Sequence, residues 1–188
     1  MKHLFRRIIS PTQLITRIHP FVILCLILII AAGIQLRLAW DDALAMDELA
    51  HIPAGYTYAD SLQYRLNPEH PPLVKYLSGA TLALWSSSFP YASSFWTLRT
   101  NEQWNLGRIF IYELHALDYR TLIFLARLFP IIIFLFLIGI TYIAGQAISS
   151  PRWALVPAFF VAFSPHFLAH GHFVTTDVGA AAFYTASL

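Results

Sequence analysis

Residues 21–38 read FVILCLILIIAAGIQLRL, an apolar stretch in which only Gln35 and Arg37 are strongly polar. The stretch nearly reaches the roughly 20 residues that a helix needs to cross the hydrocarbon core of a bilayer. The whole chain is 57% hydrophobic and 12% charged, whereas an ordinary soluble domain carries about 25% charged residues. The sequence therefore predicts an all-α integral membrane protein.

Further apolar runs follow at residues 128–148 and 153–170, joined by a short SSPR turn, and another begins at 178. Pro130 falls in the predicted first turn of the second run, where a missing N–H costs least. The last run stops at Leu188, too early to cross a bilayer. We therefore expect residues 1–188 to form the N-terminal part of one multi-pass helical bundle, without a second domain.

The basic residues place the N-terminus in the cytoplasm. The segment before the first span contains Lys2, Arg6, Arg7 and Arg17 and no acid, and cytoplasmic flanks carry such an excess of Lys and Arg. A cleaved signal peptide is the competing interpretation, but its apolar core is only about 7–15 residues long. Residues 40–120 then form a large extracytoplasmic loop, and we expect the protein in the bacterial inner membrane.

Composition also narrows the choice of partners. The net charge of +2 and the scattered basic residues give none of the basic stripe that nucleic-acid binding requires. Cys25 is the single cysteine, so no internal disulfide can form. Membrane lipid is the partner that the composition favours, and nucleic acid is not expected.

The acidic residues gather on the outer side. The predicted outer loop contains nine of the ten: Asp41, Asp42, Asp47, Glu48, Asp60, Glu69, Glu102, Glu113 and Asp118. The tenth, Asp177, follows the third span and so faces the same side. The need of a large loop for solvating charge also explains such a distribution. Only the spacing within the motifs can distinguish a functional cluster of carboxylates from a solvated loop.

The loop opens with AMDELAHIPAGYTYADSL at 45–62, which has helical spacing. Asp47 and His51 are four residues apart and Glu48 and His51 three, so all three side chains can share one helix face. Neighbouring carboxylates beside an imidazole at a membrane surface suit a general base. A helix start with solvated charge is the alternative.

The next motif, YRLNPEHPPLVKYLSGATLALW at 64–85, contains two proline breaks. Pro72 is expected to open a helix over 73–85, which we place in the outer membrane interface because a full crossing would move Asp177 to the opposite side. Arg65, His70 and Lys75 flank the break and are candidates to bind a phosphate. For Arg65 and Lys75, contact with lipid headgroups is an equal explanation.

The third motif is FSPHFLAHGHFVTTDVGAAAF at 163–183. Its Thr-Thr-Asp sequence can cap a helix that begins near 178, and an ionisable residue such as Asp177 at the edge of a span is also a functional candidate. A metal site is an open alternative, because side chains of suitable type recur here and in the outer loop: Glu48, His51, His166, His170 and His172. No HExxH motif accompanies them.

Together, DELAH (47–51), NPEHPPLVKYL (67–77), ARLFP (126–130) and SPHFLAHGHFVTTDVGAAAF (164–183) resemble the N-terminal half of the GT-C membrane glycosyltransferases. The closest type is the protein O-mannosyltransferase group, glycosyltransferase family 39, with its bacterial relatives that include the lipid A aminoarabinose transferases. The resemblance extends over nearly the whole chain from residue 21. It implies a GT-C helical bundle whose first outer loop contains short interfacial helices.

The resemblance also implies a reaction. Such enzymes take a sugar from a polyprenyl-phosphate donor and transfer it, with inversion, to a hydroxyl of a lipid, glycan or protein on the extracytoplasmic face. Asp47 would be the catalytic base, with Glu48 or Asp177 positioning acceptor or sugar. A lysine of the family's K-P-P motif is replaced by His70, so Lys75 is a substitute candidate for the phosphate contact. The resemblance implies no particular cofactor, and a divalent metal ion is an open alternative.

Two alternatives to this enzyme remain at the level of the sequence. The early stop within an apolar run is also typical of a truncated, non-catalytic membrane scaffold, and we expect residues 1–188 alone to be inactive. The histidines leave a metal-binding membrane protein as the other alternative.

Overall fold

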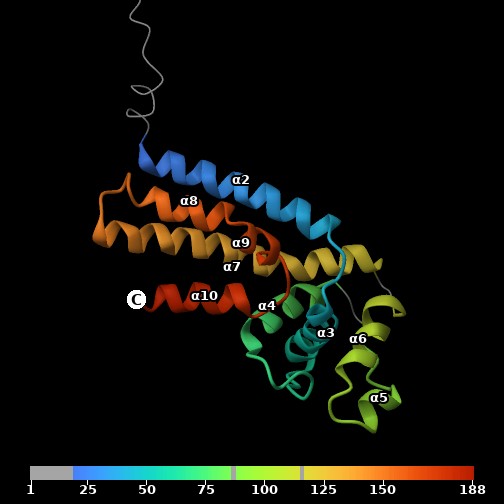
Figure 1. Cartoon of the computed structure of the whole chain (residues 1–188). Coiled ribbons are helices and arrows are strands. Elements are labelled where there is room, and N and C mark those ends of the chain that lie inside the picture. Colours follow the sequence, from blue (N-terminus) through green and yellow to red (C-terminus); the bar gives the residue numbers. More distant parts are fainter. Residues whose placement is uncertain (1–18, 86–87, 115–116) are drawn as a thin grey trace, which may run out of the picture.

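The computed structural model describes residues 19–85, 88–114 and 117–188, and every regular element in these ranges is a helix. The basic residues that predicted the sidedness, Lys2, Arg6, Arg7 and Arg17, lie outside the described ranges. Long helices lie side by side along one direction, and the short helices of the predicted outer loop gather at one end of them (Figure 1). The prediction of an all-α protein is confirmed.

Within the described ranges, two helices are long and apolar enough to cross a membrane: α2 (Pro20–Asp41) and α7 (Tyr119–Ile148). The N-cap residue of α2 is His19, whose side chain accepts a hydrogen bond from the Phe21 amide. The N-cap residue of α7 is Asp118, whose side chain accepts hydrogen bonds from the amides of Arg120 and Thr121. These caps satisfy backbone donors that a helix start leaves without partners.

The cap at Asp118 corrects one prediction. Helix α7 starts at Tyr119, nine residues before the predicted start of that span, so Pro130 lies inside the helix and not in its first turn. The apolar run alone gave the position of the hydrophobic segment, but the helix extends beyond it because capping and packing against the outer-loop helices stabilise the earlier turns.

The predicted third span is broken in two. Helix α8 (Leu155–Phe163) ends at Ser164, and α9 (Pro165–His170) starts immediately after it. Ser164 has extended backbone angles, as the residue before a proline usually does. Helix α10 (Asp177–Ala186) then begins where the sequence predicted. Helix α8 packs against α2 and α7, and α10 packs against α7 (Figure 1).

The segment predicted as the outer loop forms a compact group of helices: α3 (Met46–Ser61), α4 (Pro72–Ala83), α5 (Ser94–Thr97) and α6 (Gln103–Tyr112). The helical predictions for the two motifs at 45–62 and 73–85 are therefore confirmed. Helix α3 packs against α4 and α6, and α4 also packs against α7. One cluster of buried residues, including Tyr56, Phe110 and Leu122, forms the core of this group.

Helices α3 and α4 cross at two glycines. A Cβ atom added to Gly79 would lie 2.0 Å from the carbonyl carbon of Gly55, and one added to Gly55 would lie 2.0 Å from the carbonyl oxygen of Lys75. The backbones themselves are in contact here, so no flexible side chain can move to admit a methyl group. This close crossing holds the helix of the DELAH motif against the helix that contains Lys75.

We expect Gly79→Ala to lower the free energy of unfolding by about 1–3 kcal/mol, the usual cost of overpacking. The matched control is Gly139→Ala in α7, where an added Cβ meets nothing within 4 Å and alanine should be neutral or stabilise the helix by up to about 1 kcal/mol. Thermal unfolding of the purified protein in detergent measures both. Equal stability of the two variants would show that the helices do not cross at Gly79.

Candidate functional site

A buried ion pair between Glu48 and Arg127 lies where α2, α3 and α7 meet. Both side chains are 0% exposed, and their two hydrogen bonds measure 2.9 Å (Nε to Oε1) and 2.6 Å (Nη2 to Oε2). Arg127 also donates to the carbonyl oxygens of Ala39, Asp42 and Ala43, at 2.9–3.0 Å. All five N–H groups of the guanidinium are therefore used.

Glu48 also binds the turn before α10 to the site where α2, α3 and α7 meet. Besides Arg127, its carboxylate accepts hydrogen bonds from the amides of Ala45 and Val174, each at 3.0 Å. Val174 belongs to the turn before α10, far away in sequence. Both oxygens of Glu48 are thus occupied by protein donors, so its carboxylate joins two segments of the chain to Arg127.

The three side chains expected on one face of the DELAH helix differ in burial, although Asp47 stays close enough to His51 to act on its pKa. Glu48 and His51 are buried, whereas Asp47 is exposed in the first turn of α3. The buried pair draws the N-terminus of α3 against the bundle on the side of Glu48, and this leaves Asp47 facing solvent. Asp47 is accordingly the carboxylate of the motif that a substrate can reach.

His51 lies beneath this surface in one defined tautomer. Its Nδ1 is 2.7 Å from the carbonyl oxygen of Val174, and a carbonyl only accepts, so Nδ1 carries the proton and Nε2 has the free lone pair. Burial lowers the pKa of His51, Lys75 and His70 lower it further, and Asp47 opposes them. The ring is therefore neutral at neutral pH. The exposed His70 packs edge-on against it, with ring centroids 5.1 Å apart.

Lys75 stabilises the turn at residues 67–70, before α4. Its Nζ donates to the backbone oxygen of Asn67 (2.6 Å), the side-chain oxygen of Asn67 (2.8 Å) and the backbone oxygen of His70 (2.8 Å). Burial lowers its pKa to about 8. Its three N–H groups stabilise the turn around Asn67, whose φ of 48° is left-handed. The amine that was a candidate for the phosphate is thus already engaged.

Arg65, the other cationic candidate, is engaged elsewhere. Its guanidinium lies 4.0 Å from the centre of the Trp96 ring and donates to the backbone oxygens of Trp96 and Arg99. It therefore fixes the segment containing α5 and lies apart from the contacts around Asp47. Of the four predicted substrate-binding residues, the contacts bring His51, His70 and Lys75 together, and Arg65 lies apart from them.

Asp177 starts α10 and is exposed. The turn before it is docked on α3, because Val174 donates to Glu48 and accepts from His51. The alternative of a Thr-Thr-Asp cap is not realised through side chains: the N-cap residue Thr176 makes no side-chain hydrogen bond. Asp177 instead lies in the first helical turn, where the helix dipole favours negative charge.

Sequence reasoning missed a buried contact of His172. The ring is buried, with Nδ1 3.0 Å from the side-chain oxygen of Gln35 and Nε2 3.2 Å from Asp42. It therefore links the turn before α10 to the end of α2. The polar Gln35 within an otherwise apolar span was the available signal, and it indicated a buried hydrogen-bond partner.

The metal alternative finds no support in the described ranges. No group of three His, Cys, Asp or Glu side chains there is placed to hold a metal ion. His166 and His170 are adjacent on α9, with ring centroids 4.9 Å apart, but His51 and His172 are each bonded to other parts of the protein. The helical spacing correctly predicted that His166 and His170 lie side by side. The fold does not bring His51 or His172 to them as further ligands.

The burial of His172 predicts acid sensitivity. Burial, with a smaller effect of Arg127, lowers its pKa from 6.5 to about 4, and the opposing effects of Asp42 and Glu48 are weaker. The unfolded chain therefore takes up a proton at a higher pH than the folded protein, so stability is complete above pH 6.5 and is lost as the pH falls towards 4. The loss amounts to about 3 kcal/mol at most, from 1.36 kcal/mol per pKa unit.

We expect His172→Gln to reduce this loss, so that the unfolding temperature falls less between pH 7.5 and pH 4.5 than in the wild type. His166→Gln is the control, because that ring is exposed and its removal should leave the wild-type pH dependence unchanged. Thermal unfolding at a series of pH values measures both. An identical pH dependence in His172→Gln and the wild type would contradict the assignment.

No family model, curated protein or solved structure matches the chain. The chemical possibilities of the site therefore follow from its geometry: an exposed carboxylate, a second exposed carboxylate on a turn docked beside the same helix, and a pair of histidines of which one is neutral.

Proposed function

We propose that the protein is an integral membrane glycosyltransferase that moves a sugar, with inversion, from a polyprenyl-phosphate donor to a hydroxyl acceptor on the extracytoplasmic face of the bacterial inner membrane. The observation that carries this proposal is the exposed carboxylate of Asp47 on a helix end that a buried ion pair fixes in place. The GT-C-like order of the motifs supplies the reaction class.

The contacts of Glu48 and Arg127 fix the helix end that carries Asp47, which supports Asp47 as a base with a defined orientation. The Glu48–Arg127 pair joins the end of α2, the start of α3 and α7, and Glu48 adds the turn that leads to Asp177. Two carboxylates from distant parts of the chain are thus attached to one rigid cluster. Fixed orientation of catalytic groups lowers the entropic part of a reaction barrier.

In the proposed reaction, Asp47 accepts the proton of the acceptor hydroxyl as the hydroxyl oxygen forms a bond to C1 of the sugar. The bond between C1 and the phosphate oxygen breaks, and its electron pair leaves with the polyprenyl phosphate. Attack from the face opposite the phosphate inverts the configuration at C1. A base in this position contributes about 10²–10⁴-fold to the rate.

The phosphate needs a positively charged partner more than a proton donor. Lys75 is occupied by Asn67 and His70, and Arg65 by the segment around Trp96. His70 is exposed and adjoins His51, and it replaces the lysine of the family's motif. We therefore assign the phosphate contact to the imidazole of His70, with neutral His51 supporting its ring.

The experiment is a sugar-transfer assay in membranes that contain the protein from its natural reading frame, with a pool of polyprenyl-phosphate sugars and isolated membranes as acceptor. The proposal expects transfer that depends on the protein and a product with inverted configuration at C1. Normal membrane insertion without transfer of any sugar would favour the non-catalytic scaffold instead.

A further inference from the structure

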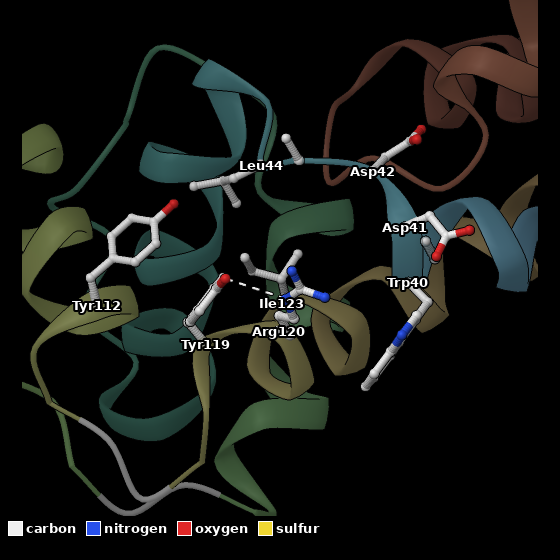
Figure 2. A pocket seen from close by; sticks show the side chains of 10 residues that line it. Trp40, Asp41, Asp42, Leu44, Tyr112, Tyr119, Arg120 and Ile123 are labelled. Carbon is white, nitrogen blue, oxygen red and sulfur yellow. Dashed lines mark hydrogen bonds between the residues drawn. The ribbon is translucent and has the colours of Figure 1, made fainter.

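A cleft of about 250 Å³ opens beside the ends of α2, α6 and α7 (Figure 2). None of the residues assigned to sugar transfer lines it. Its walls carry three aromatic rings and three charged groups: Trp40, Tyr112, Tyr119, Arg120, Asp41 and Asp42. Such a combination of rings with charges of both signs is unusual for a surface that faces only lipid tails, and it indicates a ligand that is itself charged at two places.

The guanidinium of Arg120 is available to an anion. Its Nε donates to the hydroxyl of Tyr119 at 3.3 Å, and within the described ranges neither Nη1 nor Nη2 has a hydrogen-bond or ion-pair partner. In Figure 2 the side chain stands between Tyr119 and the wall formed by Trp40 and Asp41. The first amides of α7 are already capped by Asp118, so an anion here would be bound by the side chain of Arg120.

The carboxylates of Asp41 and Asp42 offer acceptors to a cation. Oδ2 of Asp41 pairs with Arg37 at 2.5 Å, in a solvent-exposed bridge of the kind that contributes little. Oδ2 of Asp42 lies 3.2 Å from His172. The second oxygen of each carboxylate has no hydrogen-bond or ion-pair partner among the residues that the structure describes. Trp40 and the tyrosine rings add faces that attract a cation.

The position of the cleft identifies the ligand. It lies at the ends of α2 and α7, the two helices that are long enough to cross a membrane, and Trp and Tyr are enriched at the level of lipid headgroups. We propose that the cleft binds a phosphoethanolamine group, with the phosphate on Arg120 and the primary ammonium on Asp41 and Asp42. A lipid of the outer leaflet or soluble phosphoethanolamine can supply this group.

Other headgroups fit less well. A headgroup with a phosphate and no amine, such as phosphatidylglycerol, would place its negative charge near Asp41 and Asp42 without compensation. A choline headgroup carries a cation that cannot donate a hydrogen bond to these carboxylates. Phosphoethanolamine alone among the three satisfies both signs of charge through hydrogen bonds.

Native mass spectrometry of the purified protein in detergent tests the proposal, with phosphatidylethanolamine, phosphatidylcholine and phosphatidylglycerol of identical acyl chains. The expected result is preferential binding of phosphatidylethanolamine, weakened about tenfold by Arg120→Gln, the effect of losing one charge-assisted interaction. The matched control is Arg108→Gln, because Arg108 is exposed and pairs with Glu113 on the outer surface of α6. It should bind like the wild type.

Both variants remove one exposed positive charge, and unchanged unfolding temperatures would show that both are folded. Competition by soluble phosphoethanolamine would show that the headgroup suffices, and its absence, with lipid selectivity retained, would show that the group is recognised as part of a lipid. Equal binding of the three lipids, or equal loss in the two arginine variants, would overturn the proposal.

Discussion

Arg127→Leu is expected to destabilise the protein by about 3–5 kcal/mol, the cost of leaving one partner of a buried ion pair without the other. The carboxylate of Glu48 would stay at a site that is 0% exposed, with only the amides of Ala45 and Val174 as donors. The carbonyl oxygens of Ala39, Asp42 and Ala43 would lose their donors as well. We expect the end of α2 and the start of α3 to separate from α7.

Unfolding temperature and yield of folded protein in detergent measure this effect. Arg108→Leu is the matched control, because its ion pair with Glu113 is exposed and such pairs contribute about 1 kcal/mol or less. A double variant, Glu48→Leu with Arg127→Leu, should recover part of the lost stability, since it leaves no buried charge without a counter-ion. A single Arg127→Leu variant as stable as Arg108→Leu would contradict the structure at this point.

The sequence predicted the apolar helices and the two motif helices α3 and α4, because apolar runs and helical spacing are local signals, but it did not place α5 or α6. It placed helices at 21–38, 45–62 and 73–85 with small errors at the ends. It did not predict the break at Ser164, which lies within an apolar run. The start of α7 at Tyr119 depends on a cap outside the apolar segment, and hydrophobicity alone does not report such a cap.

Of the candidate site, the sequence predicted that Asp47 and Asp177 lie on the same side of the protein. The bonds of Val174 to α3 bring the turn before Asp177 to the DELAH helix. The burial of Glu48 beside an exposed Asp47 was not predictable from spacing, because it depends on Arg127, which is 79 residues away from Glu48 in sequence. Spacing along one helix cannot report a partner on another.

The role of Lys75 illustrates the same limit. From the sequence, a lysine after a proline break is a reasonable phosphate ligand. In the structure its amine is bound by the oxygens of Asn67 and His70, because the chain reverses at Asn67 and points these oxygens towards α4. As a result, Lys75 stabilises the turn and is not available to a phosphate, whereas His70 on that turn is exposed to solvent.

Asp47→Asn is expected to lower the rate of sugar transfer by about 10²–10⁴-fold, the usual contribution of a general base. The amide keeps the size and the exposed position of the side chain but does not accept the proton of the acceptor hydroxyl. Folding should be unaffected, because the bonds that fix the start of α3 belong to Glu48 and not to Asp47. The loss should therefore appear in transfer and not in membrane insertion.

Asp60→Asn is the control. Asp60 is an exposed carboxylate on the same helix and accepts a hydrogen bond from the hydroxyl of Tyr91, which an asparagine oxygen can also accept. This variant should transfer sugar at close to the wild-type rate and so exclude a general effect of removing a negative charge from α3.

The most direct test is the initial rate of transfer per inserted molecule, compared between the wild type and Asp47→Asn in the same membranes. A decrease of at least about a hundredfold, with equal insertion and with Asp60→Asn near the wild-type rate, is the result that we predict. Transfer by Asp47→Asn at the wild-type rate would contradict the assignment of Asp47 as the base.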